Sequence, residues 1–187
     1  MKKLILIALI PALLFSCKTQ NEKSKETEKK QETEEQSDVK ASTLTKVGQQ
    51  VPAFSFETVE GEQYTMSELE GKVVLLNFFA TWCPSCMKEM PALQDQVWNQ
   101  YKDKDDFFMV SVGREHNVQE MKEFQEKKGY TFNFAPDTGR VIYGQFAEKY
   151  IPRNVLVDKG GKIIYQCAGF KEKDFNELLG MIEKKLE

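Results

Sequence analysis

Two cysteines with a two-residue spacer, Cys83-Pro84-Ser85-Cys86, are the part of the sequence best suited to chemistry. Pro84 fits the first turn of a helix, where an N–H would have no intrahelical partner. Cys83 then lies near the N-cap, where free backbone amides and the helix dipole favour the thiolate. We therefore predict reversible dithiol–disulfide exchange, with Cys83 as the exposed nucleophile and Cys86 as the resolving thiol. The alternatives are an inert structural disulfide and half of a metal site.

The elements that must position these sulfurs flank them directly. The run Val73 to Phe79 is apolar and rich in β-branched and aromatic residues, which is typical of a central strand buried on both faces. A helix is expected from the cysteines to about Tyr101, with a kink at Pro91. A second buried strand is expected over residues 107–112.

The rest of the domain alternates between strand and helix patterns. We expect a hairpin from 51–56 and 63–66, a short helical turn capped by Ser67, a helix from Asn117 to Lys128 ended by Gly129, a strand at 131–135, a helix from Asp137 through Lys149, strands at 153–157 and 162–167, and a closing helix from Lys171 to Leu186. This order predicts an α/β fold, with a mixed central β-sheet, helices on both faces and an N-terminal β-hairpin extension.

The N-terminal quarter has a different composition. Residues 1–17 have a basic start and an apolar run too short to cross a bilayer comfortably, and Leu14-Phe15-Ser16-Cys17 resembles a bacterial lipobox. We expect a lipoprotein signal peptide with Cys17 as the lipidated residue; an ordinary secretory signal is the alternative. Residues 18–45 are almost wholly polar and charged and should form a solvated tether, which leaves 46–187 as the folded domain.

Composition restricts the possible functions. The chain has 187 residues and a net charge of −3, so nothing favours nucleic acid as a partner. Its four cysteines are not arranged as a disulfide scaffold, and no histidine follows Cys86 as haem attachment requires. A lone pair of cysteines also lacks the second half of a zinc site. We expect no metal and no cofactor.

Trp82-Cys83-Pro84-Ser85-Cys86 after an apolar strand resembles the active site of the thioredoxin superfamily, and residues 46–187 more specifically resemble the TlpA/ResA-like thiol–disulfide oxidoreductases. The resemblance implies a thioredoxin-like fold and a membrane-anchored enzyme of the bacterial cell envelope, exposed to the periplasm. Its partners would be a transmembrane thiol donor and oxidised exported proteins, with apocytochrome c among the candidates.

The second piece of the resemblance is Ile151-Pro152, which matches the cis-proline that faces the active-site loop in these folds. The resemblance implies that the backbone of Ile151 pairs with an extended substrate segment, and that Trp82 and Pro84 line the same surface. An ordinary trans proline that opens a strand is the alternative. The family commonly has hydroxyl residues after this proline, whereas this chain has Arg153 and Asn154.

Glu89 stands three residues after Cys86 and therefore on its face of the helix. In ResA-like proteins a glutamate at this offset lies close to the cysteines, which implies that Glu89 takes up the Cys86 proton. Classical thioredoxins instead bury an aspartate six residues before the first cysteine, where this chain has Asn77, which cannot titrate. The alternative is that Glu89 is a solvated acid in the first turns of the helix.

Three other residues have simpler interpretations. Trp82 either shields the cysteine pair or only packs against its surroundings. His116, the only histidine, lies in a polar turn and is expected to be an exposed bystander. Cys167 lies in an alternating strand and is expected to be a core residue.

Two other functions stay open on similar folds. A peroxiredoxin-like peroxidase needs a threonine three residues before its reactive cysteine, but position 80 is Ala and Thr81 comes one place too late. A copper-delivery protein pairs more widely spaced cysteines with a histidine near the later strands, and His116 is badly placed for that role.

Overall fold

The computed structural model describes residue 34 and residues 36–187. The predicted signal segment, Cys17 and residues 18–33 of the predicted tether lie outside the described residues. Backbone contacts divide the chain into two units, Met1–Asp38 and Val39–Glu187; the described residues of the first are helical. Within the described residues, no helix has both the length and the apolar character needed to cross a bilayer.

The folded unit begins earlier than the predicted boundary at residue 46. Ser42 and Thr45 are buried, and Thr43 forms an antiparallel bridge with Ala147. Two further backbone hydrogen bonds join this segment to the same loop, from the N–H of Leu44 to Phe146 and from the N–H of Glu148 to Ser42. Residues 42–45 therefore belong to the domain, although their polar composition resembles that of the tether.

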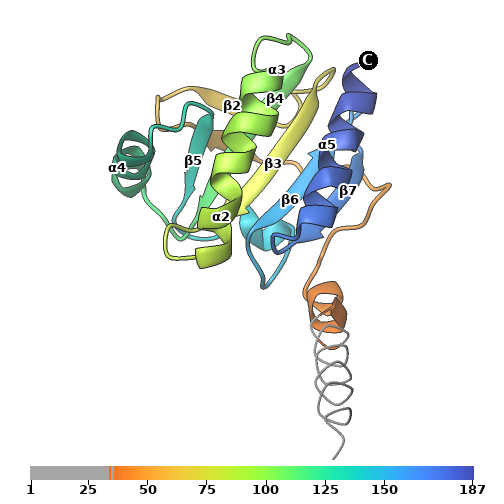
Figure 1. Ribbon diagram of the computed structural model, residues 1–187, viewed down its shortest axis with the longest axis horizontal. Helices are drawn as coiled ribbons and strands as arrows, with labels where there is room; N and C mark the ends of the chain where they lie inside the picture. Colours follow the sequence, from red (N-terminus) through yellow and green to blue (C-terminus); the bar gives the residue numbers. More distant parts are fainter. Residues whose placement is uncertain (1–33, 35) are drawn as a thin grey trace, which may run out of the picture. The chain divides into compact units, whose positions relative to one another are not determined.

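The centre of the domain is a mixed five-stranded sheet in the order β5-β4-β3-β6-β7 (Figure 1). Its strands are β3 (Val73–Phe79), β4 (Phe107–Arg114), β5 (Asn133–Asp137), β6 (Arg153–Val157) and β7 (Ile163–Ala168). β3 lies in the middle, parallel to β4 and antiparallel to β6, and all of its residues are buried. The predicted central strand is thus confirmed.

The N-terminal extension is the predicted hairpin, formed by β1 (Ser55–Glu57) and β2 (Gln63–Thr65). The segment after it is a turn and not a helix. The capping exchange is made by Thr65, whose hydroxyl accepts from the N–H of Glu68 at 3.2 Å while the Glu68 carboxylate accepts from the N–H of Thr65 at 2.8 Å. The prediction of Ser67 as the cap was therefore displaced by two residues.

The long helices lie on one face of the sheet. They are α2 (Pro84–Ala92), which continues through the π-helical segment η1 (Leu93–Trp98) and α3 (Asn99–Tyr101), then α4 (Val118–Lys128) and α5 (Glu172–Leu186). The predicted end at Tyr101 and the caps of α4 at Asn117 and Gly129 are confirmed. Pro91, inside α2, is followed at once by the π-helical turns, which accommodate the hydrogen bond that proline cannot donate.

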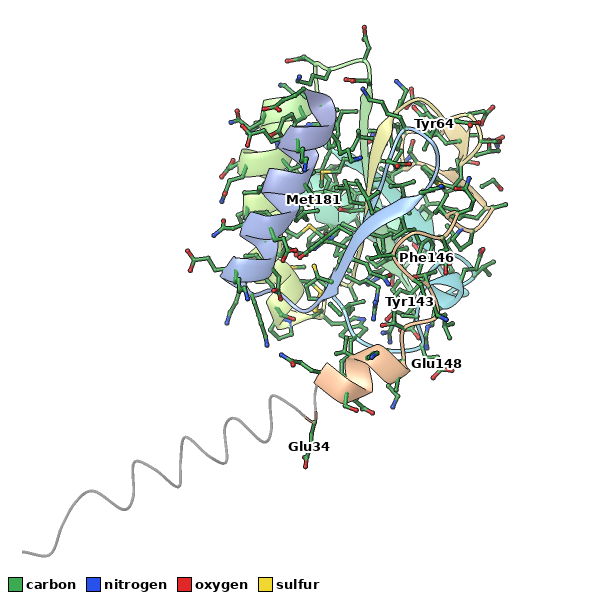
Figure 2. The ribbon with its side chains drawn as sticks, turned by 90° about the vertical axis from the view of Figure 1, so that its right-hand side faces the viewer. Glu34, Tyr64, Tyr143, Phe146, Glu148 and Met181 are labelled. Atoms are coloured by element: carbon green, nitrogen blue, oxygen red, sulfur yellow. A yellow bond between two sulfur atoms is a disulfide. The ribbon has the colours of Figure 1, made fainter. Side chains whose placement is uncertain are left out.

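The predicted helix from Asp137 through Lys149 is wrong, because only η2 (Tyr143–Gln145), a short 3-10 helix, forms there. Asp137 is still part of β5, and its carboxylate accepts the N–H groups of Ile142 and Tyr143. Arg140 has a left-handed backbone with φ of 57°, which an α-helix cannot continue through. The hairpin and η2 therefore cover the second face, and Figure 2 shows Tyr143 and Phe146 on the far side of the sheet from Met181 of α5.

Three strand ends meet at one edge of this sheet. β3 and β4 are parallel and end there at Phe79 and Arg114, while the antiparallel β6 begins there at Arg153. The loop from Ala80 to Cys83 leads from β3 into α2 at the same edge. The topology thus brings the cysteine motif and Ile151-Pro152 together, although 68 residues separate Cys83 from Ile151.

Candidate active site

Cys83 and Cys86 form a disulfide at the first turn of α2. Cys83 is the N-cap residue, with an extended backbone, and its sulfur accepts a hydrogen bond from the backbone N–H of Cys86 at 3.2 Å. Pro84 occupies the start of the helix, and the first turn carries no acidic side chain. The sulfur of Cys83 therefore lies at the positive end of the helix with an amide donor in place, an arrangement that stabilises a thiolate once the bond is reduced.

The expectation that Cys83 is exposed is wrong. Only 4% of Cys83 is accessible to solvent, and Cys86 is completely buried. The Ile151 carbonyl oxygen lies 3.7 Å from the Cys83 sulfur and the Ser85 hydroxyl 3.4 Å from it, so neighbours from two segments cover the sulfur. A partner disulfide therefore has to approach along a narrow edge of Cys83, whereas Cys86 can be reached only through Cys83.

The rim of this edge consists of residues that the sequence singled out. Trp82 is 59% exposed and Pro84 is also exposed, while Ile151 is half-buried. The Ile151-Pro152 peptide bond is cis, as the family resemblance implied. The guanidinium carbon of Arg114 lies over the Trp82 ring, 5.6 Å from its centroid.

Glu89, three residues after Cys86 on α2, is buried in a polar network. Only 1% of it is exposed, and its two carboxylate oxygens accept from the side-chain amides of Asn154 at 2.7 Å and Asn77 at 2.9 Å. The Ser111 hydroxyl in turn donates to the Asn77 carbonyl at 3.0 Å. Glu89 is therefore not the solvated acid of the alternative interpretation.

Burial changes the acidity of this carboxyl. Desolvation raises the pKa of Glu89 from 4.5 to about 7, even though the hydrogen bonds from Asn154 and Asn77 act to lower it. Near neutral pH the group thus exists in both protonation states, which is the condition for a general acid or base. The sequence marks Asn154 only as a departure from the family pattern; its polar side chain directly before the apolar run Val155–Val157 is the available signal for this contact.

His116 is not the exposed bystander that the sequence suggested. It is 6% exposed, and its Nε2 accepts the backbone N–H of Thr81 at 3.0 Å, directly before Trp82. An accepting Nε2 carries no proton, so in the neutral ring the proton is on Nδ1, which lies 3.4 Å from Glu120. His116 therefore supports the loop that presents the disulfide, through a contact between the segments that follow β4 and β3, which a polar turn in the sequence does not reveal.

Cys167 is separate from the redox pair. It is a half-buried free thiol on β7, opposite Asn154 in the strand register, and the Asn154 amide nitrogen lies 4.0 Å from its sulfur. Desolvation raises the pKa of this thiol to about 11, so it is protonated near neutral pH and a poor nucleophile. The predicted core position is wrong, because Cys167 is half-buried and belongs to neither of the apolar core clusters of the described residues.

Comparison with known families places this geometry in context. Residues 46–182 match the family model described as Redoxin. The chain is 32% identical over 139 residues to the thiol-disulfide oxidoreductase ResA of Bacillus anthracis, a match that covers 74% of this chain and 78% of that protein.

Solved structures show the same fold. A proposed protein disulfide isomerase from Bacteroides thetaiotaomicron superimposes with a TM-score of 0.75 at 33% identity, covering 78% of this chain and 92% of the other. A proposed thiol:disulfide interchange protein DsbE from Chlorobium tepidum superimposes with a TM-score of 0.65 at 29% identity, covering 76% and 99%. The fold is therefore thioredoxin-like, with a central mixed sheet.

Proposed function

This chain belongs to the Redoxin family and is a thiol–disulfide oxidoreductase of the thioredoxin superfamily, and we propose that it acts as a reductase of exported proteins while a lipid on Cys17 holds it at a membrane. The observation that carries the proposal is the Cys83–Cys86 disulfide at the start of α2, with the Cys86 amide directed at the Cys83 sulfur. That arrangement supports a stable Cys83 thiolate, the species that attacks disulfides.

The reaction is a transfer of two electrons from the dithiol to the substrate. The Cys83 thiolate attacks one sulfur of the substrate disulfide, and the other substrate sulfur leaves as a thiolate. Cys86 then loses its proton and attacks Cys83, which releases the second substrate thiolate and forms the Cys83–Cys86 disulfide. A thiol donor must return two electrons for the next cycle.

We assign the proton of Cys86 to Glu89. Glu89 follows Cys86 by three residues on the same helix, and a carboxyl with a pKa of about 7 can accept a thiol proton near neutral pH. The buried amides of Asn77 and Asn154 hold the carboxylate in place for the transfer. Trp82, Pro84 and Ile151 form the rim that meets the substrate, with an extended segment paired to the Ile151 backbone, while Pro152 is buried directly behind Ile151 and acts only through the backbone that it fixes.

Location and partners follow from the N-terminal sequence and the resemblance. A lipidated Cys17 and a tether over residues 18–45 suit a domain of the bacterial cell envelope that faces the periplasm. The electron donor is then a transmembrane thiol carrier, and the substrates are oxidised exported proteins. Apocytochrome c before haem attachment is the substrate class that the ResA-like resemblance favours.

The two alternative functions receive little support. Thr81, the residue nearest to the threonine position of peroxidases, directs its N–H to His116 and its hydroxyl lies 3.4 Å from the same nitrogen. The Nε2 atom of His116 is occupied by this contact, so the imidazole is not free to share a copper ion with the cysteines.

Trapping the intermediate tests the assignment. In cells expressing Cys86→Ser on a Cys167→Ala background, Cys83 should hold its target as a mixed disulfide, recovered in the membrane fraction and identified by mass spectrometry. The matched control, Cys83→Ser, should hold none. Wild-type activity in a Cys86→Ser protein that traps nothing would contradict the assigned roles.

A further inference from the structure

The arginines of this chain are concentrated in one place. Only three of the 26 basic residues are arginines, and all three surround Tyr143. The guanidinium carbons of Arg114 and Arg140 lie 5.2 Å and 5.4 Å from the Tyr143 ring centroid, and Arg153 interacts with the Tyr143 side chain. Lysines carry the remaining positive charge, so this site uses the residue type whose planar donors suit fixed hydrogen bonds.

Three members of this cluster bind three consecutive carbonyls. Arg140 donates to the carbonyl of Glu148 at 2.6 Å, Arg153 to that of Lys149 at 3.4 Å, and the Tyr143 hydroxyl to that of Tyr150 at 3.1 Å. These carbonyls belong to the loop without regular secondary structure that leads into Ile151-Pro152. We propose that Arg140, Tyr143 and Arg153, here called the carbonyl clamp, are positioning residues that fix this loop for protein substrates.

The energetics of Arg153 support a role beyond packing. Its side chain is 1% exposed, and within residues 34 and 36–187 it has no carboxylate partner. Besides the Lys149 carbonyl it has the Thr43 hydroxyl at 3.2 Å, while its Nε and that of Arg140 are buried without a hydrogen-bond partner in the described chain. Burying an uncompensated guanidinium is costly. A well-packed apolar side chain would fill the same space at a lower cost in folding free energy. The hydrogen bond from Arg153 to the loop therefore explains the presence of an arginine better than packing does.

The loop held by the carbonyl clamp borders one side of the narrow edge at which Cys83 can be reached. The carbonyl of Ile151, the residue after the clamped carbonyls, lies 3.7 Å from the Cys83 sulfur. Tyr150 and Arg140 both have left-handed backbones, with φ of 72° and 57°, which residues other than glycine seldom adopt without outside support. Arg114 connects the arginine cluster to the Trp82 side of the same edge, because its guanidinium also lies over the Trp82 ring.

This inference rests on the proposed function and specifies its substrate class. An extended protein segment must pair with the backbone at Ile151, whereas a small disulfide needs only the Cys83 edge. A loop held in its binding conformation spares the substrate the entropy of ordering it. The clamp therefore favours protein disulfides over small ones.

The test compares insulin with Ellman's reagent as oxidants of the reduced enzyme. In Tyr143→Phe and Arg153→Met, the ratio of kcat/KM for insulin to that for Ellman's reagent should fall about tenfold, mainly through KM, as expected for the loss of one fixed hydrogen bond. Amide hydrogen exchange at Tyr150 and Ile151 should accelerate in both. Lys122→Met, an exposed change on α4, is the control and should alter neither quantity.

An unchanged ratio, whether both rates fall together or neither falls, would overturn the clamp. Tyr143→Phe removes a single hydroxyl from a buried ring, so this variant can still test the clamp if Arg153→Met fails to fold. The proposed function has its own baseline in the same assay. Failure of the wild-type protein to reduce insulin would contradict that function, whereas a wild-type enzyme that reduces insulin with an unaltered ratio in the variants would contradict only the clamp.

Discussion

Two neighbouring residues of β6, Arg153 and Asn154, point to opposite faces of the sheet and into two different buried polar sites. On the α2 side, Asn154 binds the carboxylate of Glu89, a buried acid whose described partners are two neutral amides. On the Tyr143 side, Arg153 is itself a buried base, bound to a carbonyl and a hydroxyl. Each site thus buries one charge without its opposite within the described residues.

The two charges differ in how they respond to burial. A carboxyl group becomes neutral by taking up a proton at an accessible pH, and burial raises the pKa of Glu89 to about 7. Burial also lowers the pKa of Arg153, but a guanidinium is so strong a base that it keeps its proton near neutral pH. The Glu89 site can therefore exchange a proton during the reaction, whereas the Arg153 site is a permanent charge that can only hold its neighbours.

The largest expected difference between the two sites is in stability against pH. Below its ordinary pKa of 4.5, Glu89 is protonated in both the folded and the unfolded chain. As pH rises towards 7 the unfolded chain loses this proton while the folded chain keeps it, so the free energy of unfolding should fall by about 3 kcal/mol and then level off. Urea unfolding of the oxidised protein at about pH 4 and about pH 8 measures this fall.

Glu89→Gln should remove that pH-dependent component, whereas Arg153→Met should retain it. Other carboxyls contribute equally to the wild-type protein and to both variants, so the difference between the curves isolates Glu89. Parallel curves for the wild-type protein and Glu89→Gln would show that the carboxyl is not perturbed in the folded state.

The next largest effect concerns the rate of exchange. Glu89→Gln keeps the shape of the side chain but cannot accept a proton, so attack by Cys86 should slow by roughly 10- to 100-fold near neutral pH. The step near pH 7 in the pH–rate profile of insulin reduction should disappear with it. The exposed Glu123→Gln on α4 is the matched control. A profile that keeps its step in Glu89→Gln would exclude Glu89 as the proton acceptor.

Sequence reasoning predicted what is set locally. β3, the capped helix α4, the β6–β7 hairpin and the position of Cys83 at the start of α2 follow from patterns spanning about a dozen residues or fewer. Sequence reasoning failed for the helix after Asp137, because the strand pairing of β5 with β4 and the bridge from Thr43 to Ala147 override the local pattern.

The burial and support of the site residues depend on contacts between segments that are far apart in the sequence. The burial of Glu89 involves Asn154, 65 residues away, and the role of His116 involves Thr81, 35 residues away. Neither contact is marked in the sequence by a hydrophobic periodicity or a motif. The same is true of the arginine cluster, whose three members are scattered from Arg114 to Arg153 and meet only because strand ends converge at one edge.

The smallest predicted effect is a shift in the pKa of Glu89, which tests whether Asn154 lowers that pKa. The hydrogen bond from Asn154 lowers the pKa of Glu89, so Asn154→Leu should move the step in the pH–rate profile to higher pH. Asn77→Leu should move it in the same direction by less, because Asn154 is the stronger of the two donors.

The side chain of Asn154 faces away from the carbonyl clamp. The ratio of kcat/KM for insulin to that for Ellman's reagent, measured in Asn154→Leu at a pH below the step, where Glu89 is protonated, should therefore equal the wild-type ratio. A step that stays in place in Asn154→Leu, or a preference that falls with it, would mean that the two faces of β6 are not the independent sites inferred from the structure.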